Sequence, residues 1–142
     1  MLEVMIAILT ITAFSIGTLQ FMAFTALYKV RAERQAQANF WIQEDFEDVK
    51  YLASSLAFDE KWCTGEEGYA TALRGQLTAT PIPDQTIVGK NYSLSRTFPD
   101  DDEAQSAYPH RLRIDYQVQN QENDVIARSS VEVIPDASFK CR

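Results

Sequence analysis

The feature that most constrains this chain is an uncharged, largely apolar run from Val4 to Tyr28. A helix of that length, at ~1.5 Å per residue, covers the ~30 Å hydrocarbon core of a bilayer. A secretory signal peptide is the alternative, but it needs a basic region before the apolar core and a small-residue cleavage site after it. Neither is visible, so the run predicts a membrane-spanning helix. Any basic leader that guided insertion has been removed, or was never part of this sequence.

Two features bear on which side of the membrane holds the rest of the chain. Lys29, Arg31 and Arg34 follow the run, and by the positive-inside rule alone they would place the C-terminal part in the cytoplasm. Cys63 and Cys141 favour one disulfide in an oxidising compartment over two unrelated thiols. Such a closure contributes on the order of 4 kcal/mol. We give the cysteines more weight, because a missing basic leader would outweigh the downstream charges.

The polar part of the chain begins with a second helical pattern. No Gly or Pro interrupts the sequence from residue 29 until well past Phe58. Apolar residues recur at helical spacing at Ala38, Ile42, Phe46, Val49, Ala53 and Leu56, and the opposite side carries Gln43, Glu44, Glu47 and Lys50. We therefore expect one continuous helix over about residues 1–56, roughly 80 Å long. Its apolar half covers 1–28, and its amphipathic half, 29–56, needs a partner.

The rest of the chain supplies that partner. Residues 57–91 are rich in turn formers and predict a connecting loop with one or two short strands. Period-two alternation then predicts strands at 92–98, 111–118 and 125–133, with a hairpin turn at NQENDV, although Arg96 interrupts the apolar side of the first. The expected fold is α+β: a long helix whose second half packs on a small antiparallel sheet within 92–134, followed by a tail, 135–142.

Glu3 stands at the head of the apolar run and allows two interpretations. One is an acid in the first helical turn, favoured there by the helix dipole and lying at headgroup depth. The other is that these helices leave the membrane and pack together, which buries the carboxylate and is very costly unless a cation pairs with it. The cation that recurs with it in every copy is the free N-terminal amine, carried here by Met1. Such a pair would fix the axial register of a stack of helices.

The segment LEVMIAIL, with a spanning helix that runs into an amphipathic one, resembles the mature N-terminus of type IV pilins and type II secretion pseudopilins. The motif covers about 30 residues, and RAERQAQANFWIQEDFEDVKYLA is similar to cyanobacterial prepilin-type proteins. In that family the glutamate is the fifth mature residue, so Met1 and Leu2 correspond to the third and fourth positions and Glu3 to the fifth. Against that pattern, two residues and the leader are missing. The family's frequent proline near Gln20 is also absent, and only Gly17 could loosen the helix.

The resemblance implies a ladle-shaped subunit of a helical filament, most like a minor pilin. It implies that a prepilin peptidase processes the chain and methylates the new N-terminal amine. The subunit would then be stored in the inner membrane. Pilus assembly machinery would add it to other pilin subunits, in an extracellular pilus or a periplasmic pseudopilus. Glu3 and Met1 would set the register. The filament core would include Val4, Ile6, Ile8, Leu9, Ile11, Phe14, Leu19 and Phe21. The cysteine pair resembles the disulfide that often staples the pilin C-terminal region. The head would decorate the outside of the filament, and the filament would serve cell adhesion or motility.

The remaining candidate sites are weak. Asp100, Asp101, Asp102 and Glu103 could bind calcium, but they lack the ligand spacing and Gly of an EF-hand, so we expect a solvated acidic loop. His110 is the only histidine and is expected at the surface. No phosphate-binding, dinucleotide or zinc motif appears, and we expect no cofactor. Trp41, Trp62 and Phe40 are interpreted as packing residues.

The sequence therefore favours a structural subunit over an enzyme, for want of a convergent catalytic set. The formal net charge of −7 argues against nucleic acid as a partner. Two alternatives to a pilus subunit stay open: a pseudopilin of a secretion system, which follows the same physics in a short piston, and a single-pass anchored binding module. Lys29, Arg31 and Arg34 could pair with acidic residues of neighbouring subunits.

Overall fold

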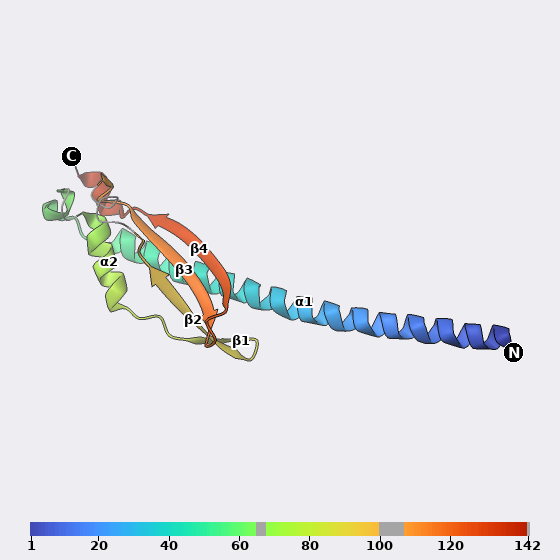
Figure 1. The fold of residues 1–142 in the computed structure, drawn as a ribbon. Coiled ribbons are helices and arrows are strands. Elements are labelled where there is room, and N and C mark those ends of the chain that lie inside the picture. Colours follow the sequence, from blue (N-terminus) through green and yellow to red (C-terminus); the bar gives the residue numbers. More distant parts are fainter. Residues whose placement is uncertain (65–67, 100–106, 142) are drawn as a thin grey trace.

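The structure, a computed structural model, describes residues 1–64, 68–99 and 107–141. Helix α1 opens the chain, and shorter elements follow it in the order α1 (Leu2–Ser55), η1 (Glu60–Cys63), α2 (Tyr69–Ala79), β1 (Gln85–Ile87), β2 (Lys90–Thr97), β3 (Leu112–Asn120), β4 (Val125–Val133) and η2 (Asp136–Lys140). Figure 1 shows the second half of α1 lying along one face of the sheet, while its first half projects alone. We call everything from residue 29 onward the head. This α+β layout confirms the predicted fold class and matches the pilin-like description.

The sheet is antiparallel throughout, in the order β1-β2-β3-β4. The three predicted strands are confirmed, with ends that shift by one or two residues. On β3 the apolar positions Leu112, Ile114, Tyr116 and Val118 are at most 1% exposed, as period-two alternation requires. The predicted hairpin turn joins β3 to β4, where Asn120 Oδ1 accepts hydrogen bonds from the backbone N–H groups of Glu122 and Asp124.

The amphipathic half of α1 covers the inner face of this sheet. The six predicted apolar positions are buried or partly buried, and Gln43, Glu44, Glu47 and Lys50 are exposed, so the predicted helix face is confirmed. Trp41, 4% exposed, packs in the core as expected. Phe40 does not: it is 67% exposed, because it lies on the side of the helix that turns away from the sheet.

Helix α2 corrects the expected loop at 57–91. The segment does contain a short strand, β1, but residues Tyr69–Ala79 are helical. Four residues of this helix are buried: Tyr69, Ala70, Leu73 and Leu77. Successive members are one, three and four positions apart, which is the spacing of a helix that packs one side into a core. Turn-forming residues around the helix, and Gly75 within it, obscured this pattern. Gly68 caps the start of α2 where the carbonyl of Pro109 lies so close that a Cβ atom would not fit.

Arg96, which interrupts the apolar side of β2, ties three elements together. Its guanidinium donates two hydrogen bonds to the Asp45 carboxylate of α1, the Nε bond at 2.8 Å, and both side chains are at most 10% exposed. Its Nη1 also donates to the carbonyl oxygens of Leu77 and Thr80 at the end of α2. Burial lowers the pKa of Arg96, but the hydrogen bond and charge of Asp45 outweigh that effect and raise it above its usual value. This bidentate pair orients α1 and α2 on the sheet.

Replacing one member of the pair should be more harmful than replacing both. Arg96→Met alone leaves the Asp45 carboxylate buried without a partner, which typically costs about 3–5 kcal/mol. The double variant Arg96→Met with Asp45→Leu should recover a large part of that loss in urea unfolding. Lys50→Met, which removes an exposed ion pair with Glu47, is the control and should cost under about 1 kcal/mol. Equal losses in the single and double variants would contradict the assignment.

Tyr116 lies opposite Arg96 in the β2–β3 register, and its buried hydroxyl lies near the Asp45 and Arg96 side chains but forms no hydrogen bond of standard geometry among the described residues. Burial and the nearby Asp45 charge raise its pKa above the ordinary 10.0. The unfolded chain therefore loses this proton at a lower pH than the folded chain. The contribution of the Tyr116 hydroxyl to the free energy of unfolding is therefore present in full below pH 10. It is lost as the pH rises toward the folded-state pKa.

We predict that Tyr116→Phe leaves stability at pH 8 unchanged or raises it by up to about 1 kcal/mol, because an unpaired buried hydroxyl is removed. The variant should also lose less stability than wild type between pH 8 and pH 11, as measured by urea unfolding at both values. A variant that is less stable than wild type at pH 8 would show that the hydroxyl has a hydrogen-bond partner.

Candidate functional site

The first half of α1 receives no cover from the other described residues of the chain. Every residue from 1 to 29 is exposed, and none of its most apolar window is buried. The eight predicted core positions, from Val4 to Phe21, are between 53% and 76% exposed. By length and composition this is the one helix among the described residues that could cross a membrane. A helix that is apolar on all sides requires lipid or other helices around it.

The hydroxyl groups of this segment do not spoil its apolar character. Each hydroxyl donates a hydrogen bond of 2.7–3.2 Å to a carbonyl oxygen three or four residues earlier. The donor residues are Thr10, Thr12, Ser15, Thr18 and Thr25. Polar groups that are satisfied within the helix can enter lipid or a helix bundle without a water partner. Gly17 leaves an open space on the helix surface, since no atom lies within 4 Å of the point that a Cβ would occupy there.

The charged groups at the start of α1 are exposed in the single chain. Glu3 lies in the first turn and Met1 is the N-cap residue, which contributes no side-chain cap. Among the described residues Glu3 forms no ion pair within the chain. The helix dipole favours an acid at this end, so this position suits both interpretations of Glu3.

Four cations lie where the apolar half of α1 meets the head: Lys29, Arg31 and Arg34 on the helix and Lys90 on β2. We call this set the basic collar. Arg34 Nη2 donates a 3.4 Å hydrogen bond to the carbonyl oxygen of Val88, and its Nε is buried without a hydrogen-bond partner among the residues that the structure describes. Within the described residues, none of the four forms an ion pair with a carboxylate of its own chain.

The turn that Arg34 holds is strained. Val88 has φ +44° and Gly89 has φ +75°, the paired positive values of a tight two-residue hairpin turn. A β-branched residue rarely adopts this conformation, whereas Asn or Gly does so easily. The turn therefore owes its position to its surroundings, among them the contact with Arg34.

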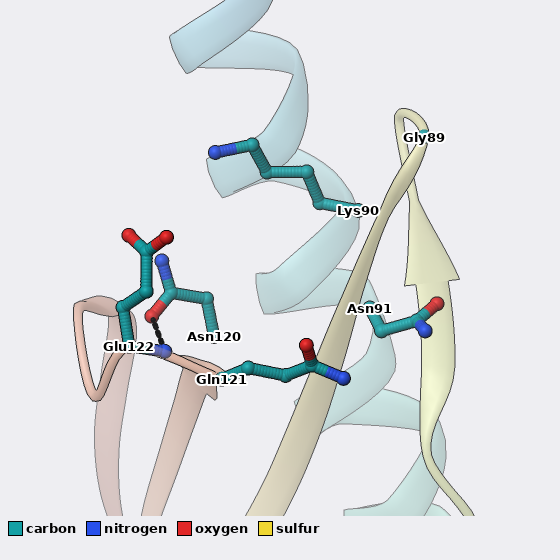
Figure 2. A pocket seen from close by; sticks show the side chains of 6 residues that line it. All are labelled: Gly89, Lys90, Asn91, Asn120, Gln121 and Glu122. Atoms are coloured by element: carbon teal, nitrogen blue, oxygen red, sulfur yellow. Dashed lines mark hydrogen bonds between the residues drawn. The ribbon is translucent and has the colours of Figure 1, made fainter.

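The β1–β2 and β3–β4 turns together enclose a polar cleft of about 340 Å³. Figure 2 shows its lining: Gly89, Lys90 and Asn91 from one turn and Asn120, Gln121 and Glu122 from the other. We call the end of the sheet formed by these two turns the turn edge. Sequence reasoning recognised the second turn but did not bring the two together, because only the strand order places them side by side.

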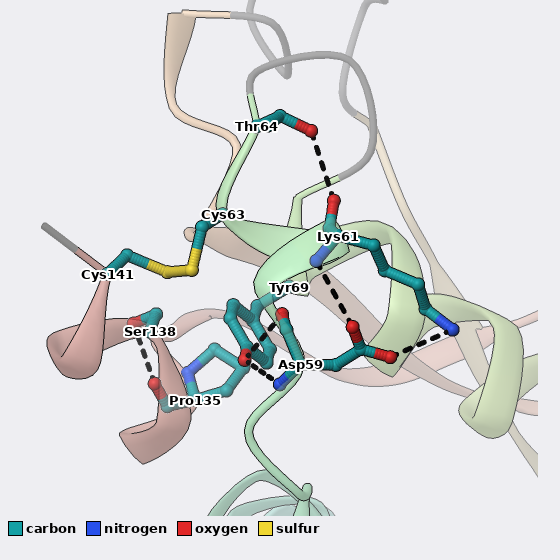
Figure 3. Close-up of a disulfide and its surroundings, with 8 residues drawn as sticks. All are labelled: Asp59, Lys61, Cys63, Thr64, Tyr69, Pro135, Ser138 and Cys141. Atoms are coloured by element: carbon teal, nitrogen blue, oxygen red, sulfur yellow. Dashed lines mark hydrogen bonds and ion pairs between the residues drawn. A yellow bond between two sulfur atoms is a disulfide. The ribbon is translucent and has the colours of Figure 1, made fainter.

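The predicted disulfide is present at the opposite end of the head. Cys63 and Cys141 are bonded, with Cα atoms 5.4 Å apart and a sequence separation of 78. Figure 3 shows the bond joining η1 to the residue after η2. Beside it the buried Tyr69 hydroxyl accepts a hydrogen bond from the backbone N–H of Asp59 and donates to its carbonyl oxygen. The Lys61 N–H and ammonium bind the Asp59 carboxylate and lower its pKa.

Removing the disulfide should lower stability without changing the fold. Cys63→Ser with Cys141→Ser is expected to reduce the free energy of unfolding by about 4–5 kcal/mol, because the unfolded chain regains the freedom of a long loop. Urea unfolding of the full chain in detergent micelles measures the change. Treating wild type with reductant should give a similar loss, and an unchanged unfolding midpoint in both cases would contradict the prediction.

The weaker candidate residues form no additional site. The predicted calcium ligands, Asp100 to Glu103, lie outside the described residues. His110 is half-buried and its ring lies 5.8 Å from that of Tyr69, so it is less exposed than expected. Trp62 is half-buried with the Lys61 ammonium 4.8 Å from its ring centre. No group of three potential metal ligands occurs in the part of the chain that the structure describes.

Comparison of the chain with protein-family models, with curated proteins and with solved structures finds no match. The class of the molecule therefore rests on its architecture: a helix of membrane-spanning length and composition whose second half packs on a small antiparallel sheet stapled by a disulfide. Nothing beyond that class is assigned from similarity.

Proposed function

We propose that this chain is a structural subunit, most like a minor pilin, of a type IV pilus or pilus-like filament. Its apolar half, residues 1–28, would lie in the inner membrane before assembly and in the core of a helix bundle afterwards. The observation that carries this proposal is that the head is complete without those residues, since all of them are exposed and none contributes to the hydrophobic core. A surface this apolar on every side needs neighbours.

The charge pattern of α1 favours a polymer over a simple tether. In a simple tether Glu3 would lie in water at headgroup depth and would not affect contacts between copies. In a bundle of parallel helices, the Glu3 carboxylate of one copy would lie among apolar side chains unless it met a cation. The N-terminal amine of an adjacent copy is a cation that recurs with every subunit, so the pair would fix the axial step between subunits.

The contacts in such a polymer would be heterologous, so that each subunit presents one surface to the copy before it and another to the copy after it. The head would then decorate the outside of a core built from the first halves of α1. A secretion pseudopilus would use the same contacts, and the length of the polymer would separate the two assemblies.

Glu3→Ala tests the proposal. Removing one partner of a buried ion pair typically costs about 3–5 kcal/mol, so the amount of polymer should fall at least ~100-fold. Electron microscopy and sedimentation of filaments measure the loss, and vesicle flotation should show that the variant still inserts into membranes.

The matched control is Glu33→Ala, which removes an exposed acid outside the apolar half and should leave assembly unchanged. If Glu3→Ala forms polymer as wild type does, the register role of the carboxylate is wrong. A wild-type protein that inserts into membranes and never forms a polymer would favour the single-pass binding module instead.

A further inference from the structure

The basic collar lies at the depth where phospholipid headgroups would surround α1. The headgroup layer on each side of a bilayer is about 5–8 Å thick. At ~1.5 Å per residue, Lys29 and Arg31 follow Tyr28, the last residue of the uncharged run, by about 1.5 and 4.5 Å and so lie within this layer, and Arg34 follows it by about 9 Å, at the outer edge of the layer. Tyr28 is itself 68% exposed, and tyrosine is favoured at this boundary.

The distribution of these cations around the helix suits lipid better than one protein neighbour. At about 100° per residue, Lys29, Arg31 and Arg34 point in directions of roughly 0°, 200° and 140°. A protein partner would contact one side of the helix, whereas lipid phosphates surround it. Arg34 lies on the side of the head, since it binds the Val88 carbonyl oxygen.

The contact between Arg34 and Val88 places the turn edge at the same level. Lys90 follows Gly89 directly and is exposed, and the cleft beside it is lined by the amides of Asn91, Asn120 and Gln121. Among the described residues, the segments 29–34, 88–91 and 120–124 contain three acids, Glu33, Glu122 and Asp124. The four cations outnumber these acids. The formal net charge of the chain is −7, so its net negative charge lies entirely in the rest of the sequence.

We propose that, before assembly, the turn edge rests on the bilayer surface, with Arg34 and Lys90 facing phospholipid phosphates. The uncharged run is about 37 Å long as a helix, longer than the ~30 Å hydrocarbon core, so α1 must tilt or extend into the headgroups. A tilt toward the head brings the turns to the surface and keeps the acidic part of the head away from anionic lipid. The strained β1–β2 turn, held by Arg34, sets the position of Lys90.

This inference rests on the membrane anchoring within the proposed function and not on the polymer. The test uses the full chain, diluted to one copy per vesicle, with a spin label on a cysteine introduced at Gln121 in the β3–β4 turn. The comparison label is placed at Ser54, about 30 Å farther along α1 than Arg34. Vesicles contain a lipid with nickel chelated at its headgroup, and relaxation of the label reports its proximity to that headgroup.

The label at Gln121 should relax faster than the label at Ser54, and more so with phosphatidylglycerol than with phosphatidylcholine alone. Lys90→Glu should reduce the effect at Gln121 on the order of 5-fold or more, since each surface cation is worth about that factor. Lys140→Glu, the same charge change in η2 at the disulfide end, should have no effect.

Equal relaxation at Gln121 and Ser54, or no response to Lys90→Glu, would overturn the proposal. If the collar served an acidic neighbouring subunit instead, Lys90→Glu would impair polymer formation while Gln121 in dilute vesicles stayed at the Ser54 level, which also overturns it. Failure of the wild-type chain to float with vesicles would contradict the anchoring itself, and the polymer is tested separately through Glu3.

Discussion

The constraint on which the rest of this molecule depends is that half of its longest helix is left uncovered by the described part of its own chain. Hydrophobic surface of that extent is unfavourable in water, and a soluble monomer would not be expected to present it. The head has a complete core that begins only at Ala38, so the apolar half of α1 contributes nothing to it. We infer that its role lies in what surrounds it, and lipid or other copies of the same helix are the surroundings that we propose.

The two halves of α1 are adapted to their surroundings by different means. In the first half, threonine and serine hydroxyls bond back to the helix, so that these hydroxyls do not require water. In the second half, an apolar face packs on the sheet, and the buried Asp45–Arg96 pair fixes how the helix lies on it. The basic collar marks the boundary. In the assembly that we propose, this division would let one continuous helix leave a membrane and enter a bundle while the head stays unchanged.

Much of the fold could be predicted because its signals are local. Helical spacing between Ala38 and Leu56 and alternation on β3 each mark one buried face, and both were read correctly from the sequence. Helix α2 was missed because turn formers surround four buried residues in a short segment. Arg96 was interpreted as an interruption, since its partner Asp45 is 51 residues away in the chain. The turn edge was missed for a similar reason, because strand order alone brings its two turns together. The expected partners of Glu3 lie on other copies, so a single chain does not contain them.

The account depends most on where the Glu3 carboxylate lies when copies of the chain associate. A cryo-electron microscopy structure of the assembled polymer tests this directly. We expect the first halves of α1 to form a water-excluding core in which each Glu3 carboxylate lies within ion-pair distance, about 4 Å, of an amine from an adjacent subunit. A polymer in which Glu3 faces water, or one held together by the heads while the apolar halves lie apart, would contradict the account.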